Sequence, residues 1–195
     1  MAELTFDEIG RIQRRVAAGE TTIDAAARAY SLDELADALR MSRGMLQSIA
    51  DGWTQEQLRA RPDESARVSA DGEDTWSATE ALTHLIATEN WYLMHMGRLQ
   101  SRKEQFDLMP RGLGDHARQE MPKEETASQL RQATERLLAE IAGIAPDADL
   151  DAQRDSIFFG PLSLRGWVML ALLHDSQHFH QIQRVTESPA FPVAS

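Results

Sequence analysis

Hydrophobic residues recur at helical spacing in four stretches of the chain, at residues 31–52, 77–99, 122–146 and 163–185. The first two stretches each begin with a serine three residues before a glutamate, which is the spacing of a capping box. The third begins with a proline, which a helix tolerates in its first turn. The pattern predicts an all-α protein built as a four-helix bundle.

The remainder of the chain divides into an amino-terminal helical segment and several loops. Phe6, Ile9, Ile12 and Val16 lie in helical register before Gly19, so we predict one or two extra helices at the front. The connections between the four long stretches are rich in Gly, Pro, Asp or Arg, so we predict loops there. These loops are residues 53–76, 103–121 and 147–162.

The predicted organisation is one domain with appendages, since 195 residues form one core of ordinary size. We expect an N-terminal helical extension at 1–30, the bundle at 31–187 and a C-terminal tail at 188–195. A hydrophobic content of 42% and a charged content of 26% are typical of a soluble globular protein.

The charge of the chain bears on its partners. With 20 Lys plus Arg against 31 Asp plus Glu, the net charge of -11 disfavours nucleic acid. The run from Ile23 to Met45 resembles a helix-turn-helix, but the acidic residues within it disfavour a phosphate backbone. The chain has no cysteine, so it supplies no thiolate ligand or nucleophile.

The location of the protein is inferred from two stretches of sequence. The opening residues MAELTFDEIG have neither a basic start nor an apolar run, so we expect no signal peptide and a cytoplasmic protein. The most apolar run, from Trp167 to Leu173, falls far short of the ~20 residues that span a bilayer, so we expect no membrane contact.

Three histidines lie on the predicted inner faces of two helices. His174 and His178 are four residues apart, so their rings share one helix face at a separation that suits chelation. His84 lies on the inner stripe of the second helix and supplies a third ligand. The alternative is that these rings are core residues that hydrogen-bond to each other, to Gln177 or Gln181, or to water. Because three such rings would be costly to bury unsatisfied, we favour one divalent metal ion.

The other histidines fit the site less well. His95 is eleven residues beyond His84 and therefore ~16 Å along the helix axis, which predicts an interior or interface position instead. His180 projects to the far side of its helix and His116 lies in a predicted loop, so both are predicted at the surface.

Two motifs resemble those of the DinB-like proteins: WSATEALTHL at Trp76 to Leu85 and HDSQHFHQIQ at His174 to Gln183. The resemblance covers residues 31–187 and implies an up-down-down-up bundle, often a homodimer. It also implies one divalent ion, such as nickel or zinc, held by His84, His174, His178 and water. The chain departs from the family pattern by its 30 leading residues and by His180.

The family resemblance implies no single reaction, since its members include bacillithiol-dependent transferases and mycothiol-dependent maleylpyruvate isomerases. Our first hypothesis is a divalent-metal-dependent enzyme, either a thiol-dependent S-transferase or isomerase or a hydrolase, acting on a small electrophile. The ion (Zn, Ni or Fe) would lower the pKa of water or of an external low-molecular-weight thiol. The alternative is a noncatalytic stress-response or binding module with a structural or vestigial metal.

The sequence names no catalytic base. Glu89 and Asp175 are predicted to point away from the metal ligands, as polar helix positions, with Asp175 making a surface contact. Gln181, one turn beyond His178, is a candidate to hydrogen-bond a ligand. A cleft lined by Trp91, Tyr92 and Trp167 would favour the enzyme hypothesis.

Overall fold

A computed structural model describes residues 4–62, 75–100, 121–156 and 158–192 of the protein. Four long helices dominate it and confirm the predicted all-α bundle. They are α3 (Leu32–Gly52), α5 (Ala78–Leu99), α7 (Lys123–Ala142) and α8 (Leu164–Thr186).

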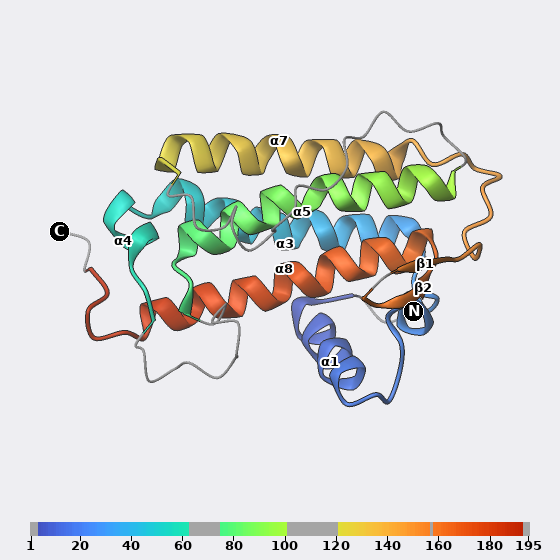
Figure 1. Ribbon diagram of the computed structural model, residues 1–195, viewed down its shortest axis with the longest axis horizontal. Coiled ribbons are helices and arrows are strands. Elements are labelled where there is room, and N and C mark those ends of the chain that lie inside the picture. The colour runs from blue at the N-terminus through green and yellow to red at the C-terminus, as the bar shows by residue number, and fades with distance from the viewer. Residues whose placement is uncertain (1–3, 63–74, 101–120, 157, 193–195) are drawn as a thin grey trace.

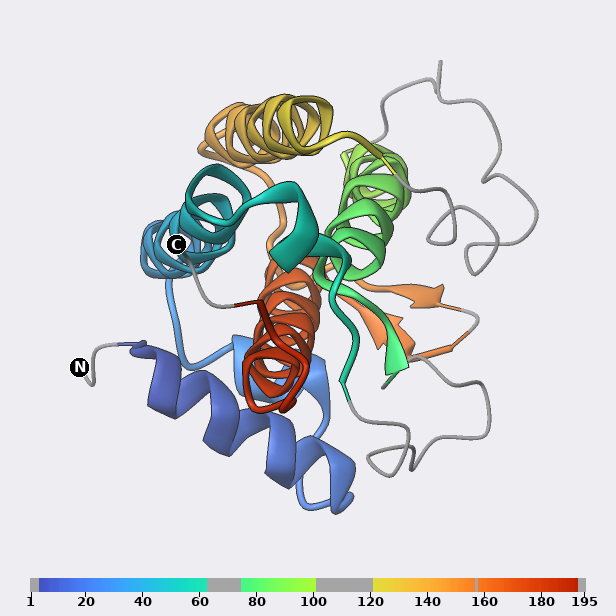
Figure 2. The ribbon, with the colours of Figure 1, turned by 90° about the vertical axis from the view of Figure 1, so that its left-hand side faces the viewer.

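The four helices run up, down, down and up in chain order, as the colour ramp in Figure 1 shows. α3 and α8 run in one direction, and α5 and α7 run in the other. Viewed along the bundle, each helix occupies one corner of a square (Figure 2), and contacts join α3 to α7, α7 to α5, α5 to α8 and α8 to α3. Because α5 and α8 are adjacent, side chains on their facing surfaces meet in the core.

Two of the helices begin with the capping boxes that the sequence predicts. The Ser31 side chain accepts from the Glu34 backbone N–H, and the Glu34 carboxylate accepts from the Ser31 N–H at 2.8 Å. Ser77 and Glu80 make the same reciprocal pair at the start of α5. These contacts satisfy N–H groups that have no partner within the helix, and they fix where α3 and α5 begin.

Two of the predicted loops contain regular structure. The segment 53–76 includes the short helix α4 (Gln55–Arg59), which has a capping box of its own between Thr54 and Gln57. The segment 147–162 includes β1 (Arg154–Ser156) and β2 (Gly160–Leu162), which form an antiparallel hairpin. The loop prediction was therefore wrong at these places. Most of the remaining predicted loop, 103–121, lies outside the described residues.

The amino-terminal segment forms α1 (Phe6–Ala17) and α2 (Ile23–Ala27), as predicted. Gly19 adopts a φ of 70°, a conformation that favours glycine, and it turns the chain between the two helices. Both helices pack against α8, and Figure 1 shows α1 crossing below it. The extension therefore contributes a second layer over one face of the bundle.

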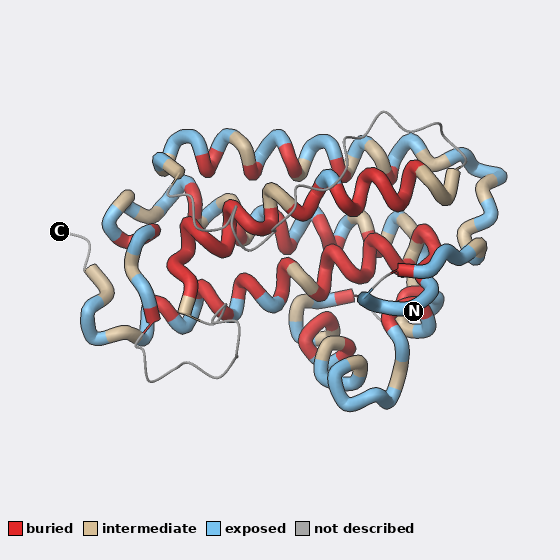
Figure 3. The backbone as a smooth tube through the Cα atoms, viewed as in Figure 1, coloured by how far each residue is buried: buried red, intermediate tan, exposed pale blue. Residues whose placement is uncertain are grey.

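Burial is greatest in α5 and α8, which are buried along most of their length (Figure 3). Positions in α7 alternate between buried and exposed. Polar residues on α5 and α8 are thus held away from water. Among the described helices, none has the length and apolar character needed to cross a membrane.

Candidate metal centre

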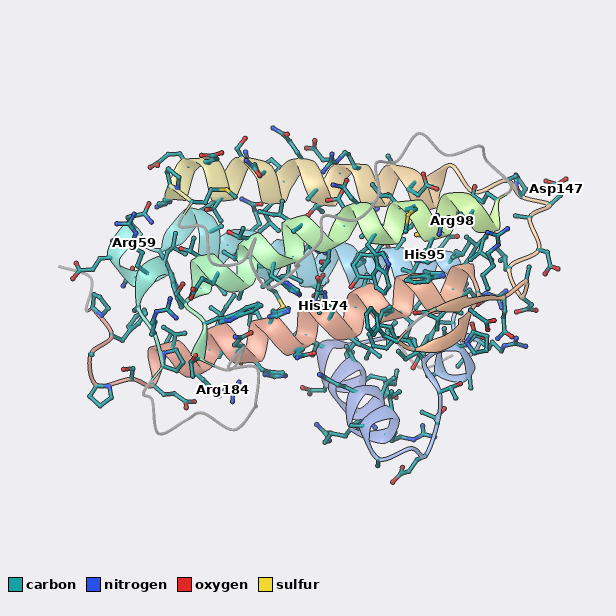
Figure 4. All side chains as sticks on the ribbon, in the orientation of Figure 1. Arg59, His95, Arg98, Asp147, His174 and Arg184 are labelled. Carbon is teal, nitrogen blue, oxygen red and sulfur yellow. The ribbon has the colours of Figure 1, made fainter. Side chains whose placement is uncertain are left out.

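The structure brings together the three histidines that the sequence singles out. His84 extends from α5, and His174 and His178 extend from successive turns of α8. The Nε2 atom of His174 lies 3.0 Å from Nε2 of His84 and 2.9 Å from Nε2 of His178. Figure 4 shows His174 near the middle of the bundle, between α5 and α8.

Burial keeps the rings of His174 and His178 neutral. His178 is fully buried and His84 is 7% exposed. Burial, followed by the neighbouring His84, lowers the pKa of His178 to about 3, and burial and the neighbouring rings hold the pKa of His174 well below its usual value. Near pH 7 each of these two rings therefore carries one N–H and one lone pair.

A partner on the far nitrogen of His178 determines where its lone pair points. The Nδ1 atom lies 2.7 Å from the side-chain oxygen of Gln181, so Nδ1–H donates and the lone pair is left on Nε2. Gln181 thus occupies the ligand-orienting position that the sequence suggests for it, one turn along α8.

Tyr92 contacts the far nitrogen of His174, because its hydroxyl lies 2.9 Å from Nδ1 of the ring. The Thr88 hydroxyl, one turn earlier on α5, donates to the Leu85 carbonyl at 3.0 Å. The hydrogen bond with Tyr92 orients the His174 ring so that its Nε2 atom lies toward the other two rings.

Trp76 closes one side of the three-histidine cluster. Its ring is stacked with that of His178 at 6.1 Å between centroids, and it meets His84 edge-on at 5.2 Å. The Trp76 side chain is itself almost fully buried. This large apolar ring keeps water from approaching the nitrogens from that side.

The three rings, which we call the histidine cluster, have the donor set of a divalent metal site. Nitrogens bound to one ion at ~2.0–2.1 Å and at angles of about 90° to 110° lie about 2.9–3.4 Å apart, which matches the two short separations here. All three ligand atoms lie within 4.8 Å of one another. In the described ranges, no fourth His, Asp or Glu belongs to this group.

A cavity of about 140 Å³ opens beside the histidine cluster. Its lining includes His84, His174, Thr88 and Leu170. The aromatic rings that line it belong to Trp91, Tyr92, Phe158 and Phe159. Trp91 and Tyr92 line it as expected, but Trp167 does not. Trp167 packs behind Trp91, at 4.9 Å between ring centroids, and supports that wall.

Sequence reasoning missed Phe158 and Phe159, which lie in the turn between β1 and β2. Phe158 is 69% exposed and Phe159 is 44% exposed, although both face the cavity beside Trp91. A Phe-Phe pair next to a glycine was the available signal, but the strands are only three residues long and show no alternation.

Asp175 and Glu89 are fully buried, which corrects the expectation that Asp175 makes a surface contact. Asp175 pairs with Arg43 of α3, and Arg43 Nε lies 2.8 Å from Oδ2. Glu89 pairs with Arg136 of α7 at 3.0 Å. We call these four residues the ion-pair cluster. Arg43 and both carboxylates are buried, the Arg136 side chain is 54% exposed, and the Arg43 charge also acts on Glu89. Neither carboxylate lines the cavity.

The remaining histidines lie where the sequence places them, as far as the structure describes them. His95 is buried and stacks on Trp167 at 4.2 Å, so it is an interior residue, and Figure 4 shows it toward one end of the bundle. His180 is exposed and contacts Gln183. His116 lies outside the described residues.

The model of a protein family described as the DinB superfamily matches residues 38–182 of the chain. No curated protein matches the sequence. The matched region begins within α3, ends within α8 and contains all three rings of the histidine cluster.

Proposed function

The chain belongs to the DinB superfamily, and from that premise we propose that His84, His174 and His178 bind one divalent metal ion at the centre of an enzyme active site. The substrate is a small electrophile that enters the adjacent cavity. The ion is zinc, nickel or iron, since imidazole ligands suit all three.

One observation carries this proposal: the Nε2 atoms of the three rings converge, with that of His174 lying 2.9–3.0 Å from those of His84 and His178. Gln181 and Tyr92 contact the Nδ1 atoms of His178 and His174, so both Nε2 atoms are turned toward the centre of the cluster. Burial lowers the pKa of His174 and of His178, so near pH 7 these two rings are neutral and can act as ligands. We infer that a divalent cation binds where the three nitrogens converge.

The cavity supports the assignment of the substrate. Apolar side chains and the aromatic rings of Trp91, Phe158 and Phe159 make up most of its wall, and none of the described residues that line it is charged. Burial and the negative charge of Asp175 raise the pKa of Tyr92 far above its usual value, so Tyr92 remains a neutral phenol. These groups favour an uncharged, largely apolar molecule.

The nucleophile comes from outside the chain. The protein has no cysteine, and neither buried carboxylate reaches the cavity as a general base. A bound divalent ion supplies a Lewis acid that lowers the pKa of a water or an external low-molecular-weight thiol. The activity is therefore an S-transfer or isomerisation that uses such a thiol, or a hydrolysis.

The second candidate is a noncatalytic module with a structural ion. It would be favoured by a fourth protein ligand, because structural zinc sites have closed coordination. The cavity that reaches His84 and His174 favours the enzyme instead. A homodimer, a cytoplasmic location and the lack of a nucleic-acid partner remain predictions from the sequence.

The first test measures metal content. Purified wild type should carry about one equivalent of a divalent ion by elemental analysis, and His178→Ala should carry almost none, because a site with two ligands binds far more weakly. His180→Ala is the matched control, since His180 lies two residues away on the exposed side of α8. Equal metal in wild type and His178→Ala would contradict the assignment.

The second test measures the reaction. Wild type loaded with metal, and His178→Ala treated in the same way, are assayed with a panel of low-molecular-weight thiols and apolar electrophiles. Both are also assayed for hydrolysis of the same electrophiles without thiol. We expect turnover only with wild type. Stable metal binding without turnover across the panel would favour the noncatalytic module.

A further inference from the structure

A second cavity adjoins the one at the histidine cluster. Its volume is about 250 Å³, and it shares three residues with the first cavity: Phe159, Leu170 and His174. The two cavities are therefore neighbours. Any molecule that contacts His174 from the first cavity lies next to the second.

The far wall of the second cavity belongs to the amino-terminal extension. Gln13, Val16 and Ala17 of α1 and Ile23 of α2 line it, facing Leu173 and Gln177 of α8. The family match begins only at residue 38, so these four residues lie ahead of the region that the family model covers. The chain thus adds a wall of its own to the metal centre.

The lining of the second cavity has a definite chemical character. Among the residues that the structure describes, no charged side chain lines it, although the whole chain has a net charge of -11. The carboxamides of Gln13 and Gln177 are its polar side chains besides His174, and they offer both hydrogen-bond donors and acceptors. Such a lining favours an uncharged group with one or two hydrogen-bonding atoms.

A buried carboxylate holds the extension in this position. Asp24 of α2 is 4% exposed, and its oxygens accept from the Ser163 backbone N–H at 2.7 Å and from Gln153 Nε2 at 2.6 Å. Ser163 begins α8, and Gln153 directly precedes β1. One side chain therefore ties the extension both to the helix with two of the histidines and to the hairpin with Phe159.

The packing at this anchor is tight. A Cβ atom on Gly166, in the first turn of α8, would lie 2.7 Å from Oδ1 of Asp24. Burial alone would raise the pKa of Asp24, but the hydrogen bonds from Ser163, Gln153 and Arg28 hold that pKa below its usual value. The anchor therefore stays ionised and in place near neutral pH.

We propose that α1 and α2 complete the substrate site, and that the two cavities together take one elongated, uncharged molecule. Its aromatic or aliphatic end packs against Trp91 and Phe158 in the first cavity. Its other end passes Phe159 and reaches Gln13 and Gln177 in the second. This inference rests on the proposed function for the choice of the histidine cluster as the reacting centre, but the binding of such a molecule does not require the ion.

The test uses N-phenyl-1-naphthylamine, a neutral fluorescent probe with two joined aromatic parts, on the full-length protein. Ala17→Trp places a large ring in the second cavity from α1, and Gln177→Trp does so from α8. Each should weaken probe affinity by at least about tenfold, because the probe can no longer extend into the second cavity. Ala18→Trp, one residue beyond the cavity wall and exposed, should remain within about twofold of wild type. Thermal unfolding of all four proteins confirms that they are folded.

Two results would overturn the proposal. One is the absence of saturable probe binding to wild type. The other is an affinity in both blocking variants equal to that of wild type or of Ala18→Trp. The titration is repeated on wild type stripped of metal by a chelator, where we expect the affinity to change by less than about threefold. If the protein binds no metal but gives the expected probe affinities, the proposed function is wrong and the two-cavity site is supported.

Discussion

The histidine cluster joins α5 and α8, whereas the ion-pair cluster draws one residue from each of the four long helices, and the two differ in how their polar groups are paired. In the ion-pair cluster, Arg43 pairs with Asp175 and Arg136 pairs with Glu89. In the histidine cluster, the Nε2 atom of His174 lies 2.9–3.0 Å from those of the other two rings. His174 and Asp175 are consecutive residues, and each belongs to a different cluster.

The difference bears on which cluster is a candidate binding site. Arg43 and Asp175 carry opposite charges, so each offsets the cost of burying the other. The histidine cluster instead gathers three nitrogens of the kind that binds a divalent ion. A cavity reaches the histidine cluster, and neither carboxylate of the ion-pair cluster lines it. The donor set and the adjoining cavity together single out the histidine cluster as the candidate binding site.

The largest expected effect comes from breaking the ion-pair cluster. Asp175→Ala leaves the Arg43 guanidinium, 1% exposed, without its partner, and should lower the free energy of unfolding of metal-free protein by about 3–5 kcal/mol. Urea denaturation measures this. The double variant Arg43→Met, Asp175→Leu removes both charges and should recover most of the loss. A double variant as unstable as the single one would show that the charges themselves are needed.

The next effect concerns Glu89 and pH. Burial raises the pKa of Glu89 to about 7, although Arg136 and Arg43 oppose the rise. Because the folded protein then holds a proton that the unfolded chain loses near pH 4.5, this contribution to stability is present below pH 4.5 and is lost as pH rises through 7. Relative to Glu89→Gln, wild type should lose about 2–3 kcal/mol of unfolding free energy between pH 4.5 and 8.

The comparison with Glu89→Gln cancels the titration of all other carboxyl groups, since both proteins share them. Urea titrations at several pH values measure the difference. A difference that stays flat or grows with pH would mean that Arg136 keeps the Glu89 carboxylate ionised throughout.

A smaller effect is expected from the groups that orient the histidine cluster. Tyr92→Phe removes the hydrogen-bond partner of His174 Nδ1 and should weaken metal affinity about 10- to 100-fold. Competition with a coloured chelator measures the affinity. Tyr30→Phe is the matched control, because Tyr30 is the other tyrosine of the chain and is not among the partners of the cluster. Equal affinity in Tyr92→Phe and wild type would remove Tyr92 from the account.

The smallest effect should come from His84→Leu in the metal-free protein. Leucine replaces a buried polar ring by an apolar side chain of similar size, so the free energy of unfolding should change by less than about 1 kcal/mol. Urea denaturation without metal measures it. A loss as large as that of Asp175→Ala would indicate that the histidine cluster is a structural network like the ion-pair cluster.

The sequence predicted the bundle well where local contacts determine it. Ser31 and Ser77 mark the starts of α3 and α5 because each cap is made by residues three apart. His174 and His178 were identifiable for the same reason, since a helix fixes the relation of residues four apart. The Thr54–Gln57 spacing at α4 was equally local but the helix after it is only five residues long.

The features that escaped prediction depend on residues far apart in the chain. Arg43 and Asp175 are separated by 132 residues, and no local pattern links them. Asp24 and Ser163 are separated by 139. The cavity likewise needs the hairpin turn at Phe158 and Phe159 to lie over α5, which follows from the packing of the whole bundle. Distance along the chain, rather than the kind of residue, limited the prediction.

The most direct test of the metal centre is X-ray absorption at the zinc edge of the zinc-loaded protein, which counts the imidazole ligands. We predict three imidazole nitrogens at ~2.0–2.1 Å, together with a water or other ligand from outside the chain. One or two imidazoles, or a shell made of carboxylate oxygens, would contradict the account.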